Sequence, residues 1–516
     1  MSSELRRPIV RPVEVEARPP SLQDNMADLD RLRNALLPHC EAEPYVSFQS
    51  ISSLARLFRF ADFQGTVLIN DMGSWQGLVD LLTEYPKVLP AMALDLGTTH
   101  LEASLVNILD GSVLGRSTTA NRQIDYGEDI LTRIHFAAEG NGLHLLQQAA
   151  MESVQELTAE LALQAELKKR EIRALAVSGN TTMTHLLLGL DPYYLCREPY
   201  IPLANRPDTC EAGELGVDIH ARAPVWFMPS VGSYFGGDLI SGILSSGLAD
   251  REEVSILIDV GTNAEVVLGN RDWLIACAGA AGPALEGGIA SMGMRAGTGA
   301  IERVSIDPDS LRVDYQTVDK ARPRGLCGSG IIDLAAGLYL AGLIDIRGKF
   351  RKDRLPERFV ETNQGTAFIV AGEEETGEAP VIFGQVDMDA MMRSKAAMYS
   401  ILTTLLAQVG LGVKDLDKIY MAGSFGRHLD PRQAIVLGML PDLDPEIFVP
   451  LGNSSLAGAE LVLLDRENRK KCYEITRKIT YLELNVNQDF MIRFSGSRVI
   501  PHTDISLFPS VPVIKD

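Results

Sequence analysis

The chain has 516 residues, of which 46% are hydrophobic, and its 68 acidic and 48 basic residues give a formal net charge of −20. This length exceeds the usual size of one hydrophobic core and predicts two or three packed domains. The acidic balance argues against a nucleic-acid binder, because phosphate backbones attract clusters of Lys and Arg. The sequence shows neither an apolar signal segment nor a stretch near the roughly 18 apolar residues of a membrane span. We therefore expect a cytoplasmic protein with no membrane partner.

The six cysteines are scattered along the chain and form no Cys-x-x-Cys pair. They are Cys40, Cys196, Cys210, Cys277, Cys327 and Cys472. Iron–sulfur clusters and structural zinc sites are held by closely spaced thiolates. The pattern predicts reduced thiols in a reducing compartment and no iron–sulfur cluster in this chain.

In chain order, residues 1–20 are rich in Pro and charge and are expected to form a flexible arm. Leucines at helical spacing behind a Ser21 cap, followed by VSFQSISSLARLF and GTVLIND, predict a small α/β linker module over 21–88. From 89 to 470, short apolar strands alternate with Gly turns and amphipathic helices, which indicates a layered α/β architecture. In 471–516, β-branched and aromatic residues predict strands that pack back on the body.

One turn occurs twice, as ALDLGTTHLEASLV and as LIDVGTNAEVVLG. Each places an Asp at the end of an apolar strand, where a Gly lets the backbone approach a ligand and the next residues offer hydroxyl, amide and N–H donors. This chemistry suits a metal-bound phosphate. The residues are Asp95, Gly97, Thr98 and Thr99 in the first copy and Asp259, Gly261, Thr262 and Asn263 in the second.

An alternating stretch follows each turn and predicts the returning strand of a hairpin. A single Asp-x-Gly-Thr also occurs in ordinary β-turns. Two copies 164 residues apart, each opening a hairpin, instead fit a duplicated domain. Its halves, 89–245 and 246–470, would bind one nucleotide between them.

A third turn lies in KIYMAGSFGRHLD, residues 418–430. Its small residues Gly423, Ser424 and Gly426 would let a flat adenine or a ribose lie against the backbone. The alternative is a strand-to-helix turn with ordinary glycines. Two phosphate turns followed by a Gly-rich adenosine turn is an order that resembles the acetate and sugar kinase, chaperone and actin superfamily.

Longer segments resemble one branch of that superfamily, the ATP-dependent reductive activators of corrinoid proteins. They include NRQIDYGEDILTRIHFA, ALAVSGNTTMTHLLLGLDP, SVGSYFGGDLISGIL, GLCGSGIIDL and PLGNSSLAGAELVLL. The resemblance implies two ribonuclease-H-like (actin-like ATPase) halves behind the linker module, and a homodimer. It also implies ATP-dependent conversion of an inactive cobalt(II) corrinoid protein of a methyltransferase system to cobalt(I).

The resemblance, together with the chemistry of the turns, implies a role for each residue. Asp95 and Asp259 would act in catalysis by holding Mg²⁺ directly or through water. Thr98, Thr99, Thr262 and Asn263, with Gly97 and Gly261, would bind the phosphates of ATP. Gly423, Ser424 and Gly426 would face the adenosine.

Members of the branch usually carry cysteines that hold an iron–sulfur cluster, and this sequence departs from them there. We therefore expect a separate ferredoxin or flavodoxin to deliver the electron to the corrinoid protein. Two other functions stay open. One is a small-molecule kinase, for which Asp238 is the candidate general base; the other is a nucleotide-gated binding or assembly ATPase without a redox role.

Overall fold

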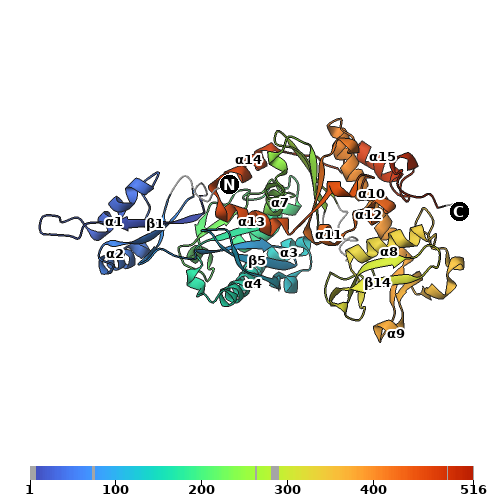
Figure 1. Cartoon of the computed structure of the whole chain (residues 1–516), viewed down its shortest axis with the longest axis horizontal. Helices are drawn as coiled ribbons and strands as arrows, with labels where there is room; N and C mark the ends of the chain where they lie inside the picture. Colours follow the sequence, from blue (N-terminus) through green and yellow to red (C-terminus); the bar gives the residue numbers. More distant parts are fainter. Residues whose placement is uncertain (1–6, 73–75, 262–263, 280–289, 485, 515–516) are drawn as a thin grey trace. The chain divides into compact units, whose positions relative to one another are not determined.

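The computed structural model of the chain, drawn in Figure 1, describes residues 7–72, 76–261, 264–279, 290–484 and 486–514. The chain divides into two units: unit 1 comprises Met1–Ser245 and Ser455–Arg477, and unit 2 comprises Ser246–Ser454 and Lys478–Asp516. The expected second half, 246–470, does not coincide with unit 2, because residues 455–470 pack in unit 1. None of the helices in the described ranges is long and apolar enough to cross a membrane.

Unit 1 is built on a six-stranded sheet in the order β6-β5-β4-β7-β9-β8. Its strands are β4 (Pro90–Leu96), β5 (His100–Asn107), β6 (Val113–Ala120), β7 (Leu175–Gly179), β8 (Cys210–Glu211) and β9 (Pro224–Phe227). β4, β5 and β6 form an antiparallel meander, and β7 and β9 continue the sheet parallel to β4. The helices that accompany this sheet are α3 (Ile130–Ala137), α4 (Gly142–Gln164), α5 (Thr181–Leu188), α6 (Ala212–Leu215), α7 (Gly237–Ser246), α13 (Ser454–Leu464) and α14 (Arg466–Lys478).

Unit 2 is built on a second six-stranded sheet, in the order β20-β19-β10-β11-β12-β21. Its strands are β10 (Ser255–Val260), β11 (Ala264–Gly269), β12 (Leu274–Gly279), β19 (Lys418–Ala422), β20 (Phe448–Gly452) and β21 (Ile479–Tyr481). β10, β11 and β12 form the meander, and β19 and β20 run parallel to β10. Five strands have the same order in both units, β6-β5-β4-β7-β9 and β12-β11-β10-β19-β20, which confirms the duplicated ribonuclease-H-like fold, and both expected hairpins are present. The sixth strand differs, because β8 pairs with β9 whereas β21 pairs with β12.

Unit 2 also carries two small sheets and six helices among its described residues. One sheet holds β13 (Ala300–Ile306), β14 (Val313–Thr317) and β15 (Gly325–Leu326), and the other β16 (Phe359–Thr362), β17 (Gly365–Ala371) and β18 (Val381–Gly384). The helices are α8 (Gly328–Leu340), α9 (Glu373–Thr376), α10 (Gln385–Gln408), α11 (Gly423–His428), α12 (Pro431–Leu437) and α15 (Gln488–Gly496).

The central strands β4 and β10 share one burial pattern. Every residue of β4 is buried except Asp95, and every residue of β10 is buried except Asp259. Strands covered on both faces read as continuous apolar runs, which is what PAMALDL and SILIDV show. The fold therefore brings one carboxylate in each unit to the carboxyl end of an otherwise buried strand.

The N-terminal module of unit 1 has the antiparallel sheet β1-β2-β3 and two helices beside it (Figure 1). Its elements are β1 (Val10–Glu16), α1 (Asp28–Leu36), α2 (Ile51–Phe60), β2 (Gln64–Asn70) and β3 (Leu78–Leu82). The expectation of a flexible arm over 1–20 is wrong for β1, whose Val13 and Val15 are buried in the core of the module. Pro12 is tolerated because β1 is an edge strand.

Two further expectations differ from the structure. The first helix begins at Asp28 and not behind Ser21, and the acidic residues of its first turn favour that start electrostatically. The regular structure of the tail 471–516 is mainly helical, with β21 as its one strand among the described residues. Arg469, Cys472 and Ile475 of α14 are buried at a spacing of three, a helical period that outweighs the β propensity of single residues.

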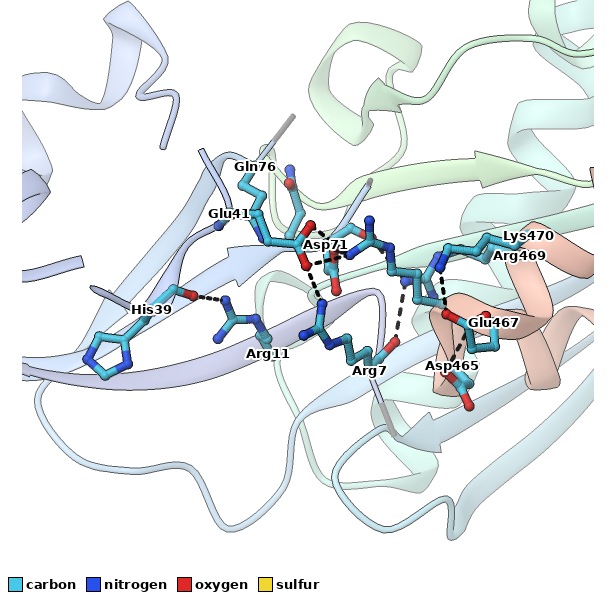
Figure 2. Close-up of polar contacts among 12 residues, drawn as sticks. Arg7, Arg11, His39, Glu41, Asp71, Gln76, Asp465, Glu467, Arg469 and Lys470 are labelled. Atoms are coloured by element: carbon cyan, nitrogen blue, oxygen red, sulfur yellow. Dashed lines mark hydrogen bonds and ion pairs between the residues drawn. The ribbon is translucent and has the colours of Figure 1, made fainter. Parts of the chain in front are cut away.

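A polar cluster joins the N-terminal module to the start of α14 (Figure 2). The buried guanidinium of Arg469 donates to the carbonyl oxygens of Val462 (2.6 Å), Asp71 (2.9 Å) and Arg7 (3.3 Å). Burial lowers the pKa of Arg469 to about 10, which still leaves it charged at neutral pH. Arg466 binds Glu41 at 3.0 Å and lies 3.5 Å from the buried carboxylate of Asp71. The module is therefore held by a helix that lies far from it in the sequence.

We expect Arg469→Ala to lower the free energy of unfolding by about 3 kcal/mol, because the carbonyl oxygens of Val462, Asp71 and Arg7 lose their buried, charged donor. Urea unfolding of the whole chain measures this change. Lys470→Ala is the matched control, since its ammonium pairs only at the surface with Glu467 (2.7 Å), and it should cost less than about 0.5 kcal/mol. Equal losses in the two variants would contradict the anchoring role of Arg469.

Candidate functional site

The first predicted turn lies at the carboxyl end of β4. Asp95 is partly exposed there, opposite Ser178 of the parallel strand β7 and opposite Glu102 of the antiparallel strand β5. Its Oδ1 accepts a 2.6 Å hydrogen bond from Ser455 of α13. A Cβ on Gly97 would lie 2.4 Å from the carbonyl oxygen of His100, so only glycine fits this close turn.

Thr98 is held by a residue that the sequence analysis did not single out. The side-chain amide of Asn180 donates to Thr98 Oγ1 at 3.1 Å, while its Oδ1 caps helix α5 by accepting from the N–H of Met183 at 2.9 Å. The available signal was SGN at the end of a buried strand, directly before a helix, which is the pattern of an N-cap. Asn180 therefore links the phosphate turn to the neighbouring strand and helix.

Asp238 stands close to this turn, in the first turn of α7. Burial, followed by the nearby charge of Asp95, raises the pKa of Asp238 to about 6, although the N–H of Leu239 donates to its Oδ1 at 2.9 Å. A Cβ on Gly236 would lie 2.4 Å from Asn180 Cα and 2.6 Å from Asp238 Oδ1. The glycine thus allows the chain around Asp238 to approach the start of α5.

The second predicted turn lies at the carboxyl end of β10, in unit 2. Asp259 is opposite Ala422 of the parallel strand β19 and opposite Glu265 of β11. Gly261 follows at the start of the turn, whereas Thr262 and Asn263 lie outside the described residues. Asp259 therefore occupies in unit 2 the position that Asp95 occupies in unit 1.

The Gly-rich turn comes next to Asp259, because β19 pairs with β10. Gly423 adopts the left-handed conformation with φ +74°, and a Cβ there would lie 3.3 Å from Asp259 Oδ1. A Cβ on Gly426 would lie 2.2 Å from the carbonyl oxygen of Met421. Ser424 is the second residue of the same short helix α11, and its side chain lies outside the described part of the structure. Asp259, Gly423 and Gly426 are thus grouped at one edge of the sheet.

The donor set fits a magnesium nucleotide. Mg²⁺ usually takes one or two protein carboxylates and completes its shell with phosphates and water. The described residues contain no cluster of three or more His, Cys, Asp or Glu side chains arranged for a metal ion. Each unit instead places one partly exposed Asp at the carboxyl end of its central strand, next to a closely packed glycine turn.

Two further residues with reactive side chains, Cys327 and His185, are buried and contact backbone carbonyl oxygens. Cys327 is buried, with its Sγ 3.4 Å from the carbonyl oxygen of Ile301. His185 is buried, its Nδ1 lies 2.7 Å from the carbonyl oxygen of Thr181, and burial lowers its pKa. All six cysteines are free thiols, and burial raises the pKa of Cys210 to about 11. These contacts assign structural roles to Cys327 and His185.

Two sheets that share the order of five strands, each with an Asp-x-Gly turn at the end of its central strand, define the duplicated fold of the actin-like ATPases. Within that class, the chain belongs to the RACo family. Models of the RACo linker region, of the RACo middle region and of the C-terminal ASKHA domain of RACo match residues 5–84, 90–251 and 253–512.

Individual relatives are similar over most of the chain. Corrinoid activation enzyme RamQ of Eubacterium limosum is 33% identical over 476 residues, which cover 90% of this chain and 78% of the relative. A [Co(II) methylated amine-specific corrinoid protein] reductase of Methanosarcina barkeri is 25% identical over 418 residues, covering 75% and 72%. The solved structure of a reductive activator for corrinoid, iron–sulfur protein has a TM-score of 0.89 at 39% identity, covering 99% of this chain and 82% of that one.

The raised pKa of Asp238 predicts a pH-dependent stability. A carboxyl group with a pKa near 3.8 when unfolded and about 6 when folded binds more protons in the folded state, so stability falls as pH rises between these values. For a completely buried group, this pKa shift would change the free energy of unfolding by about 3 kcal/mol. The partial exposure of Asp238 reduces the expected change to about 1–2 kcal/mol.

We therefore expect Asp238→Asn, in EDTA and without nucleotide, to unfold at higher urea concentration than the wild type at pH 7 and to lose this advantage at pH 4. Asp191→Asn, an exposed carboxylate of unit 1, controls for the substitution itself. An advantage of Asp238→Asn that stays constant across this pH range would contradict the assignment.

Proposed function

We propose that this protein is an ATP-dependent reductive activator that returns a cobalt(II) corrinoid protein of a methyltransferase system to cobalt(I). The observation that carries the proposal is the pair of equivalent carboxylate turns in a chain that resembles corrinoid activation enzymes over most of its length. We place the activity in the cytoplasm, where unpaired cysteines stay reduced. The protein acts as a homodimer in this proposal.

The reaction transfers one electron to cobalt(II) and yields cobalt(I), while ATP and water separately yield ADP and phosphate. Cobalt(I) is a strong reductant. Each 59 mV by which the reduction potential of the electron donor exceeds that of the cobalt(II)/cobalt(I) couple lowers the equilibrium constant for electron transfer about tenfold. Binding and hydrolysis of ATP supply the free energy that shifts this equilibrium, by favouring one state of the corrinoid partner. The electron comes from a separate low-potential ferredoxin or flavodoxin.

In this proposal Asp95 and Asp259 hold Mg²⁺ directly or through water, and the metal, when bound, neutralises charge on the phosphates. The N–H groups of Gly97 and Gly261, with Thr98, Thr99, Thr262 and Asn263, bind the phosphates and stabilise the charge that develops on their oxygens. Asn180 orients Thr98 through the 3.1 Å hydrogen bond. Gly423, Ser424 and Gly426 lie against the adenosine.

The test mixes the protein with a cobalt(II) corrinoid protein and a reduced low-potential ferredoxin, and follows the absorbance of cobalt(I) with and without Mg·ATP. We expect formation of cobalt(I) that depends on ATP. Asp259→Asn should slow it by about 100-fold or more, because a charge that stabilises the transition state is lost.

Asp444→Asn is the matched control. This carboxylate of unit 2 caps a short helical turn by accepting from the N–H of Glu446 at 3.0 Å, and its removal should leave the rate of cobalt(I) formation unchanged. A flat cobalt trace with intact ATP hydrolysis would contradict the redox role and favour a nucleotide-gated binding ATPase. Phosphate transfer to an alcohol in place of water would instead indicate a kinase.

A further inference from the structure

A chain of three buried serine hydroxyls ends on the carboxylate of Asp95. Ser455 Oγ donates to Asp95 Oδ1 at 2.6 Å, Ser178 Oγ lies 2.9 Å from Ser455 Oγ, and Ser241 Oγ lies 2.8 Å from Ser178 Oγ. Ser178 and Ser241 have no exposed surface and Ser455 has 7%. Hydroxyl groups this deep in the protein must satisfy one another, because water does not reach them.

The direction of these serine hydrogen bonds follows from the number of hydrogens that each hydroxyl can donate. A serine hydroxyl carries one hydrogen, and an ionised carboxylate can only accept. Ser455 gives its hydrogen to Asp95, so the 2.9 Å contact requires Ser178 to donate to Ser455. Ser241 must in turn donate to Ser178. All three hydroxyl dipoles therefore point toward Asp95, and successive hydrogen bonds of this kind polarise and strengthen one another.

The three serines come from separate elements of unit 1. Ser178 lies on β7 directly opposite Asp95, Ser241 lies on α7, and Ser455 lies in the first turn of α13. Gly458, one turn further along α13, packs so closely on α7 that a Cβ there would lie 2.4 Å from the Cβ of Ser241 and 2.5 Å from its Cα. This close backbone contact fixes the distance between the two helices and holds Ser241 and Ser455 within reach of Ser178.

We propose that Ser455 is a positioning residue for the magnesium site: backed by Ser178 and Ser241, it holds one oxygen of Asp95 so that the other faces the metal or its water. The inference rests on the proposed role of Asp95 as a magnesium ligand. Removal of the Ser455 hydroxyl takes away this hydrogen bond, and the carboxylate is then less restricted in its rotation about the Cβ–Cγ bond. Ligand orientation by neighbouring hydrogen bonds is worth about 10- to 100-fold in metal affinity at other sites.

The test is a Mg²⁺ titration of ATP hydrolysis by the full chain, combined with Mn²⁺ binding in the presence of ADP followed by electron paramagnetic resonance. We expect Ser455→Ala to raise the Mg²⁺ concentration for half-maximal hydrolysis, and the dissociation constant of Mn²⁺, by about tenfold. The rate at saturating metal should change by less than about twofold, because metal binding is weakened and the reacting groups remain.

Three variants separate positioning from packing. Ser455→Thr keeps a hydroxyl and should restore metal affinity to within about twofold of the wild type. Ser241→Ala removes only the hydroxyl that is farthest from Asp95 in the serine network. It should raise the half-maximal Mg²⁺ concentration and the dissociation constant of Mn²⁺ by about two- to threefold. Ser153→Ala removes a buried hydroxyl of α4 whose hydrogen bonds are to the backbone of Ala149, Ala120 and Arg122, and it should leave the metal dependence unchanged.

A shift in Ser455→Ala that Ser455→Thr restores supports the proposal, whereas wild-type metal dependence in Ser455→Ala overturns it. Equal shifts in the Ala and Thr variants also overturn it, since they would indicate lost packing. If Ser455→Ala does not fold, the presence or absence of a shift in Ser241→Ala decides. The corrinoid partner is absent from these experiments, so hydrolysis without cobalt reduction would refute the proposed function and leave this test intact.

Discussion

Much of this structure depends on the burial of two central strands that each end in a carboxylate. β4 and β10 are covered on both faces, so their side chains are almost all apolar. A charged group can exist on such a strand only at its open end, where a ligand or water reaches it. The positions of Asp95 and Asp259 follow from this constraint as much as from their chemistry.

The surroundings of the two carboxylates are built from small residues. Gly97, Gly236 and Gly423 stand where a Cβ would meet backbone or a carboxylate within 2.4–3.4 Å, and three serines fill the space behind Asp95. Small side chains let strands and helices approach closely, and hydroxyls in that narrow space provide hydrogen bonds without adding bulk. Close packing and the orientation of Asp95 are therefore produced by the same residues.

The sequence predicted the parts of the site that are local. The apolar run, the Asp, the Gly and the returning strand occur within a few residues of one another, so both hairpins and the duplicated fold could be read from the pattern. Ser455 could not be found in this way, because it lies 360 residues from Asp95 in the chain and resembles any serine near the start of a helix. Asn180 had a local signal as an N-cap, but its contact with Thr98 depends on the pairing of β4 with β7. The helical tail was missed because only the buried face of α14 reveals its period.

Because α13 and α14 are synthesised long after the rest of unit 1, they also determine when unit 1 can finish folding. The N-terminal module and the sheet of unit 1 are synthesised first, yet Arg469 binds the carbonyl oxygens of Arg7 and Asp71, and Ser455 completes the hydroxyl chain behind Asp95. Domains generally fold as they leave the ribosome, from the N-terminus onward. Here unit 1 stays unfinished until all of 246–454 has been translated, so a truncated product cannot assemble the Asp95 site.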